Sequence, residues 1–271
     1  MPKPNRYAQL IARVFLDRYG PGERDITFDR AEFQAAADTL GIALPKNLGD
    51  IIYSFRYRVP LPEAITSRAS KGQQWVIRGA GQGRYRFSLV SVATVEPQAH
   101  LITTRLPDAT PGVIDRYALS DEQSLLAKLR YNRLVDIFTG LTCYSLQSHL
   151  RTALPDLGQI ETDEVYVGID SHGAHYVLPV EAKSATDSVG IVQIEQDWAL
   201  CEHRFPGLVA LPIAAQYLDD GSIAIFSFAL VSGEIRIANE RHYALVPQSE
   251  LTDDELAQYR RLSDATGQQR D

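Results

Sequence analysis

The sequence predicts a protein of the α/β class, α+β overall, with a mixed β-sheet in its larger part and a smaller module before it. In residues 118–271, segments with helical spacing of apolar residues alternate with apolar runs typical of buried strands. In residues 1–92, helical segments precede two strands that are joined by a glycine-rich turn. Charge is also divided unevenly between these two parts, which indicates separate modules.

Composition indicates an ordinary globular chain. Its 271 residues, 45% hydrophobic and 23% charged, suffice for one large domain or two modest ones. No apolar run approaches the roughly 20 residues of a membrane helix, and the first residues lack the apolar core of a signal peptide. Cys143 and Cys201 lie far apart without metal-binding spacing, which favours reduced thiols and a cytoplasmic location.

The net charge of −7 hides a basic N-terminal third. Residues 1–90 contain 14 basic and 8 acidic residues, whereas residues 91–271 contain 13 basic and 26 acidic ones. A basic module on an acidic protein suggests a polyanionic partner. Uneven surface charge without a binding role is the alternative interpretation.

The N-terminal module follows the order helix, short strand, helix, helix, hairpin. Asp29 with Glu32 resembles a capping box at the start of the second helix, and Gly41 ends that helix. The glycine-rich run 79–83 joins two strands instead of opening a helix, so a dinucleotide site is not expected there. The expected elements are 5–18, 25–28, 29–40, 47–58 and a hairpin over 73–90.

This element order resembles a winged helix-turn-helix domain over residues 1–92. In such domains the third helix enters the major groove of DNA and the hairpin, the wing, contacts the backbone. Arginine suits both phosphate contacts and bidentate recognition of guanine. A protein-interaction domain with solubilising arginines is the alternative. The resemblance implies DNA contacts from Arg56, Tyr57 and Arg58 on the third helix and Arg78, Arg84 and Arg86 beside the wing.

Residues 93–117 are rich in proline and turn formers and are expected to form a linker or a wrapped connector. Residues 120–139 have helical spacing, Gly140 breaks the pattern, and a second helix is expected over 141–152. His149 and Arg151 on that helix are candidates for phosphate contact or for structural roles. Later elements are expected as a helix over 188–205 and strands over 208–218 and 222–231.

The segment 159–183 contains the residues that we expect to form a catalytic site. It contains a strand rich in carboxylates, a polar turn, and a second strand that ends in Glu181, Ala182 and Lys183. Residues at i and i+2 of a strand share a face, so Glu181 and Lys183 point the same way. Two acids and a lysine on one face can bind Mg2+ and orient water for hydrolysis of a phosphodiester.

This segment resembles the core of the PD-(D/E)XK nucleases, the superfamily of many type II restriction endonucleases, over roughly residues 116–271. The resemblance implies a restriction-endonuclease-like mixed-sheet core in residues 118–271, with Glu181 and Lys183 as the (D/E)xK half. Asp163 or Glu164 would be the leading acid, and these acids would bind Mg2+. The Pro155-Asp156 dipeptide lies in an expected turn and is not assigned. Gln193, on the following helix, would support the site unless it is an ordinary surface residue.

The register of the hairpin decides between the two leading acids. A two-residue turn centred just after His172 places Glu164 opposite Glu181, whereas a three-residue turn centred on His172 places Asp163 there. A shift of one residue moves every side chain to the other face. The family's usual aspartate favours Asp163, the apolar run after Glu164 favours that residue, and Glu161 is an outer possibility on the face of Asp163.

The expected function is a Mg2+-dependent endonuclease that cleaves double-stranded DNA, a type II restriction enzyme that acts as a homodimer. One alternative is a repair or defence nuclease for structured or modified DNA. A second is a non-catalytic DNA-binding regulator, in which the Glu181–Lys183 pair would be structural.

Overall fold

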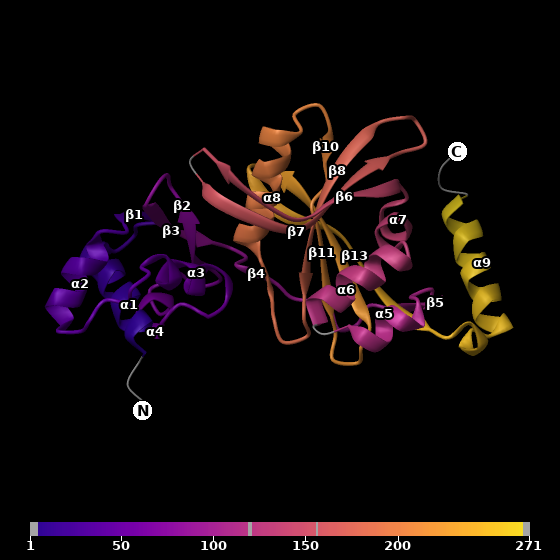
Figure 1. The fold of residues 1–271 in the computed structure, drawn as a ribbon, viewed down its shortest axis with the longest axis horizontal. Helices are drawn as coiled ribbons and strands as arrows, with labels where there is room; N and C mark the ends of the chain where they lie inside the picture. The colour runs from indigo at the N-terminus through magenta and orange to yellow at the C-terminus, as the bar shows by residue number, and fades with distance from the viewer. Residues whose placement is uncertain (1–4, 119–120, 156, 268–271) are drawn as a thin grey trace.

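The computed structural model describes residues 5–118, 121–155 and 157–267, and Figure 1 shows a smaller N-terminal body beside a larger one built on a β-sheet. The smaller body has a three-stranded antiparallel sheet in the order β1-β3-β2. Every element predicted for residues 5–90 is present, and α4 is additional. The elements are α1 (Arg6–Arg18), β1 (Asp25–Asp29), α2 (Glu32–Leu40), α3 (Gly49–Tyr57), α4 (Glu63–Thr66), β2 (Gln74–Gly79) and β3 (Arg84–Val90).

Aromatic packing holds the smaller body together. Phe15 of α1, Phe28 of β1 and Phe87 of β3 are fully buried in one apolar cluster. The Phe28 and Phe87 rings stack with centroids 4.7 Å apart, and Phe15 meets Phe87 edge-on at 5.0 Å. Offset and edge-to-face pairs of this kind are the favoured aromatic contacts. The helical spacing of the apolar residues therefore marks the face of α1 that packs on the sheet.

The larger body contains a mixed sheet of eight strands within the described residues, and the α/β class is confirmed. Strands β6, β7 and β8 pair antiparallel, β8 and β11 pair parallel, and β5 pairs parallel with β13. The strands in spatial order are β5 (Thr103–Pro107), β13 (Glu234–Val246), β12 (Ile223–Val231), β11 (Ile213–Tyr217), β8 (His175–Lys183), β7 (Gly158–Ile169) and β6 (Thr142–Leu154), with β10 (Val209–Ala210) beside β8.

Helices cover both faces of this sheet. Leu125 and Leu129 of α6 (Asp121–Tyr131) pack in one apolar cluster with Val180 and Ala182 of β8. Helix α8 (Ile191–Arg204) lies on the opposite face, where Leu200 packs with residues of β7 and β8. Side chains that alternate along β8 therefore enter two different environments.

Two helix predictions were incomplete or wrong. Residues 141–152 are not helical: they form β6, because this segment pairs with β7 along its length, a long-range contact that local spacing does not reveal. The helix expected over 120–139 is divided into α6 and α7 (Leu134–Thr139) at Arg133, whose φ is +51°. The helix and strands expected over 188–231 are confirmed as α8, β10, β11 and β12.

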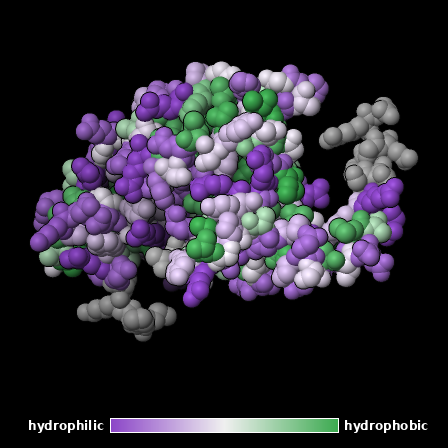
Figure 2. Space-filling model, turned by 45° about the vertical axis from the view of Figure 1, so that its right-hand side comes forward, coloured by the Kyte–Doolittle hydropathy of each residue, from purple (hydrophilic) through white to green (hydrophobic). Residues whose placement is uncertain are grey.

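The segment predicted as a linker, 93–117, is built into the larger body. It contributes β4 (Thr94–Val95), which pairs with β9 (Val189–Gly190), the edge strand β5, and helix α5 (Gly112–Tyr117). The sequence reading also missed β13 and the C-terminal helix α9 (Asp253–Gly267). No helix of the described residues is long and apolar enough to cross a membrane. Figure 2 shows a face on which hydrophobic side chains occur in small groups among hydrophilic ones.

The two bodies meet through specific polar contacts. Arg78 of β2 forms a bidentate ion pair with Glu195 of α8, at 2.5 and 2.8 Å. The hydroxyl of Tyr57 donates to Oε1 of Gln196 at 3.0 Å. A Cβ at Gly79 would lie 2.6 Å from the carbonyl oxygen of Leu157, so the backbones approach too closely for any other residue. Helix α3 is thereby held against α8.

We expect Arg78→Glu to weaken the contact between the two bodies. The substitution removes an ion pair that contributes about 1 kcal/mol and places the new carboxylate next to that of Glu195. Small-angle X-ray scattering should give a larger radius of gyration, and the exchanged pair Arg78→Glu/Glu195→Arg should restore the wild-type value. Arg84→Glu is the matched control, because Arg84 faces Asp29 within the smaller body. Scattering from Arg78→Glu identical to that of wild type would contradict this role.

Candidate active site

The register of the β7–β8 hairpin places Asp163 beside Glu181. The paired residues run from Ile169 with His175 to Glu164 with Val180, so the next row brings Asp163 opposite Glu181. Oδ2 of Asp163 also accepts a hydrogen bond from the backbone N–H of Ala182 at 2.9 Å. The turn is centred on His172, as the second predicted register required, although its loop spans five residues.

Glu181 is buried and held by two neighbours. Its Oε2 accepts from Nε2 of Gln193 at 2.8 Å and lies 3.5 Å from Nζ of Lys183. Burial raises the pKa of Glu181 well above its usual range, and the nearby carboxylates of Asp197 and Asp163 raise it further. The structure thus joins the predicted residues Glu181, Lys183 and Gln193 in one cluster.

Lys183 carries the positive charge of this cluster. Burial acts to lower the pKa of its ammonium group, but the carboxylates of Glu181, Asp163 and Glu122 outweigh that effect and raise the pKa. The side chain therefore stays protonated at neutral pH. It can neutralise negative charge and orient water, but it has no free electron pair with which to accept a proton.

Asp197 of α8 is a further buried acid, next to the candidate Gln193 on the same helix. Its Oδ1 accepts from Oγ1 of Thr162 at 2.6 Å, and its Oδ2 has no hydrogen-bond partner within the described residues. Burial raises its pKa to about 8; the Thr162 hydrogen bond opposes this shift and the charge of Asp163 adds to it. The sequence analysis assigned no role to Asp197, because the burial of a helix position depends on tertiary packing.

Glu164 does not join the cluster. It lies on the opposite face of the sheet, where it accepts from Arg130 at 2.8 Å and from Ser145 at 2.5 Å. Its side chain is fully buried. The register that places Glu164 opposite Glu181 is therefore wrong, because alternate residues of a strand face opposite sides. This carboxylate is positioned as a buried partner of Arg130 and is remote from the face on which a metal ion shared with Glu181 would bind.

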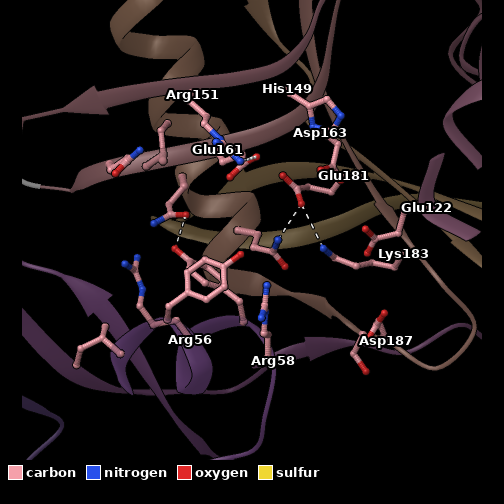
Figure 3. Close-up of a pocket in the computed structure, with 18 of the residues that line it drawn as sticks. Arg56, Arg58, Glu122, His149, Arg151, Glu161, Asp163, Glu181, Lys183 and Asp187 are labelled. Carbon is pink, nitrogen blue, oxygen red and sulfur yellow. Dashed lines mark hydrogen bonds and ion pairs between the residues drawn. The ribbon is translucent and has the colours of Figure 1, made fainter. Parts of the chain in front are cut away.

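The cluster opens into a cleft of about 790 Å³ between the two bodies, shown in Figure 3. Asp163, Glu181 and Lys183 lie on one side of the cleft, and Arg56 of α3 and Arg58, the residue that follows α3, extend from the other. Tyr53, Tyr57, Gln193 and Gln196 also line it. Helix α3 therefore faces the acidic cluster across a shared space.

The predicted DNA-binding residues divide into two groups. Arg56, Tyr57 and Arg58 line the cleft. The three arginines of the β2–β3 hairpin, the predicted wing, are instead paired with carboxylates of the protein itself. These pairs are Arg78 with Glu195, Arg84 with Asp29 at 3.8 Å, and Arg86 with Asp25 at 3.3 Å.

Several cleft residues had no role in the sequence prediction. Glu122, Asp187 and Tyr53 reach the cleft from three separate segments. His149 and Arg151 also line it, but from strand β6 and not from a helix. His149 has an unusual φ of +48°, and the β6–β7 pairing passes over it, from Ser148 with Glu164 to Leu150 with Thr162. Only the pairing of β6 with β7 places these two residues at the cleft.

The donor set is compatible with Mg2+ bound by two carboxylates. Among residues whose placement the structure gives, no group of three or more histidine, cysteine, aspartate or glutamate side chains is arranged to hold a metal ion. Mg2+, however, keeps several waters and commonly uses one or two protein carboxylates. Asp163 and Glu181 each engage one oxygen in the hydrogen bonds described above, which leaves their second oxygens for a cation.

Asp197 should make the stability of the metal-free protein depend on pH. Its pKa is raised from 3.8 to about 8 in the folded state, so the folded state binds more protons across this window and stability falls as pH rises through it. In urea unfolding with EDTA, Asp197→Asn should lose less stability than wild type between pH 5.5 and 8.5, by a few kcal/mol at most. A constant difference between the two proteins at all pH values would contradict this.

Removal of Arg130 should destabilise the fold. Arg130→Ala leaves the buried carboxylate of Glu164 with fewer donors, which should cost about 1–3 kcal/mol in the free energy of unfolding measured with urea. Arg236→Ala is a control that breaks the exposed pair with Glu234 and should change stability by less than about 1 kcal/mol. Equal effects of the two substitutions would show that the Glu164–Arg130 pair has no special role.

Comparison with known proteins leaves the chemistry of this cleft to be inferred from its own residues. A scan against protein-family models, a search of curated proteins and a search of solved structures each find no match.

Proposed function

We propose that the protein is a Mg2+-dependent endodeoxyribonuclease of the PD-(D/E)XK type. The observation that carries this proposal is the convergence of Asp163, Glu181 and Lys183 on one face of the β7–β8 hairpin, within one cleft. Lone acids on a strand would face solvent, whereas Glu181 is almost fully buried. Buried charges are costly unless they are paired or bind a metal ion. Asp163, Glu181 and Asp197 lie near one ammonium group, that of Lys183, so the carboxylates outnumber it, which favours a metal-binding role over a structural Glu181–Lys183 pair.

The protein residues would divide the work in a simple way. Asp163 and Glu181 would hold Mg2+, which when bound supplies Lewis-acid stabilisation of the phosphate charge. Gln193 holds one oxygen of Glu181 and so orients the carboxylate. The protonated Lys183 would position the attacking water and neutralise the negative charge that develops on the phosphate.

The same proposal extends to substrate and assembly. The basic residues of α3 that line the cleft, and the excess of basic residues in 1–90, favour DNA as the polyanion. We propose a type II restriction-like activity on double-stranded DNA in the cytoplasm, with a winged-helix module in residues 1–92. The described residues of a chain place Asp163, Glu181 and Lys183 in one cleft, so cleavage of both strands favours a homodimer.

Glu181→Gln and Lys183→Ala should each lower the rate of plasmid cleavage in Mg2+ by about 100-fold or more, the loss typical of removing an electrostatic stabiliser from an active site. Glu161→Gln is the matched control. Glu161 lies on β7, lines the same cleft and pairs with Arg151 at 2.9 Å, but its side chain is 39% exposed. Its rate should stay within a few-fold of wild type.

Two outcomes would contradict the proposal. If Glu181→Gln and Lys183→Ala both cleave plasmid DNA at the wild-type rate, the roles assigned to Glu181 and Lys183 are wrong. Tight DNA binding without cleavage in Mg2+, across unmodified, methylated and branched DNAs, would support a non-catalytic regulator instead. Cleavage restricted to branched or modified DNA would retain the chemistry and assign the enzyme to repair or defence.

A further inference from the structure

Helix α3 presents a paired set of aromatic and guanidinium groups on one face. The rings of Tyr53 and Tyr57, one helical turn apart, meet edge-on with centroids 5.1 Å apart. The guanidinium of Arg58 lies 4.8 Å from the centre of the Tyr53 ring, and that of Arg56 lies 4.9 Å from the centre of Tyr57. Tyr53 remains 45% exposed, so part of this side chain is accessible to a ligand from the cleft.

This face lies directly across the cleft from the acidic cluster. Tyr57 donates to Gln196, and Gln193, one turn earlier on α8, donates to Glu181. Helix α3 is therefore separated from the candidate catalytic carboxylate by a single turn of α8. The cleft volume of about 790 Å³ lies within the range of pockets that enclose one small organic ligand.

The two arginines on this face are available to an anion. Neither Arg56 nor Arg58 forms an ion pair with any carboxylate in residues 5–118, 121–155 or 157–267, in contrast to Arg78. Nε and Nη2 of Arg56 are buried without a hydrogen-bond partner in that same part of the chain. A buried guanidinium nitrogen that lacks an acceptor is costly, so a shift of the Arg56 side chain toward a phosphate in the cleft would be favoured.

We infer that the cleft takes an unpaired segment of a DNA strand, with bases stacked on Tyr53 and Tyr57 and phosphates held by Arg56 and Arg58. This inference rests on the proposed nuclease function and makes the N-terminal module part of the active site. Bases inside a duplex have their faces covered by neighbouring bases, so tyrosines can stack on them only where a strand is unpaired. Aromatic platforms combined with basic side chains are the common solution for binding single strands.

The contacts between the bodies favour the same conclusion. The Tyr57–Gln196 hydrogen bond joins α3 to α8, and Arg78 of β2 adds an ion pair to Glu195 of the same helix. A stacked duplex is wider than such a hydrogen-bond contact, so we expect a single strand, and not a duplex, to enter the cleft between the two helices. A duplex substrate would therefore have to present a locally unpaired segment.

The test compares three labelled DNAs of the same sequence: a single strand, a fully paired duplex and a duplex with a central mismatched bubble. Fluorescence anisotropy with the Lys183→Ala protein in Mg2+ measures binding while both metal-binding carboxylates are kept. The single strand and the bubble should bind more tightly than the duplex. Adding Tyr53→Ala should weaken their binding roughly 5- to 150-fold, the range for loss of one stacked base, and Tyr53→Phe should retain it.

Charge and specificity controls use the same assay. Adding Arg58→Gln should reduce the slope of log affinity against log salt by about 0.7 for the single strand, the value for one lost phosphate contact. Tyr117→Ala is the matched control, because Tyr117 is exposed on α5, carries Arg116 at 5.6 Å and does not line the cleft. That variant should bind all three DNAs like its parent.

The outcomes separate this inference from the proposed function. Duplex binding as tight as that of the single strand, unchanged by Tyr53→Ala, would overturn the inference while cleavage by the wild type would still support a nuclease. If the wild type cleaves none of the three DNAs but binds single strands through Tyr53, the proposed function fails and the binding site remains. Absence of binding to all three DNAs would overturn both.

Discussion

The register of the β7–β8 hairpin is the constraint on which the chemistry of this protein depends. With Glu164 paired to Val180, the next row brings Asp163 to Glu181, and both face α8 and the cleft. A slip of one residue would exchange the roles of Asp163 and Glu164. The two faces are strongly different, since one buries Val180 and Ala182 under α6 and the other carries Glu181 and Lys183. Such a difference specifies a single register.

Burial and charge act together within the cleft. The cluster contains Asp163, Glu181 and Asp197 beside the ammonium group of Lys183, and burial raises the pKa of Glu181 and Asp197. Several carboxylates close together repel one another when ionised, and a bound cation relieves that repulsion. The same imbalance that reduces stability at high pH therefore favours the binding of Mg2+ under the proposed function.

The contact between the two bodies gives the cleft its second wall. Tyr57, Arg78 and Gly79 meet residues of α8 and of the β6–β7 turn, so α3 lies across from the carboxylates. A winged helix on a flexible tether would only deliver DNA to a separate nuclease. Here Arg56 and Arg58 reach the same space as Lys183, so under the proposed function recognition of the strand and its cleavage would take place in one cleft.

The sequence by itself determined the elements of residues 5–90 apart from α4, the mixed α/β class and the shared face of Glu181 and Lys183. These follow from local spacing: apolar periodicity defines α1, turn glycines define the hairpin, and positions i and i+2 of a strand share a face. Such signals are carried by neighbouring residues, so no long-range contact is needed to detect them.

Only the tertiary structure decided the rest. Pairing with β7 made residues 142–154 a strand and brought His149 to the cleft, and one row of register selected Asp163 over Glu164. The packing of α8 against the sheet buries Asp197. At the contact between the bodies, Arg78 forms an ion pair with Glu195. Each of these outcomes depends on residues distant in the chain, because burial and strand pairing are properties of the assembled fold and not of local sequence.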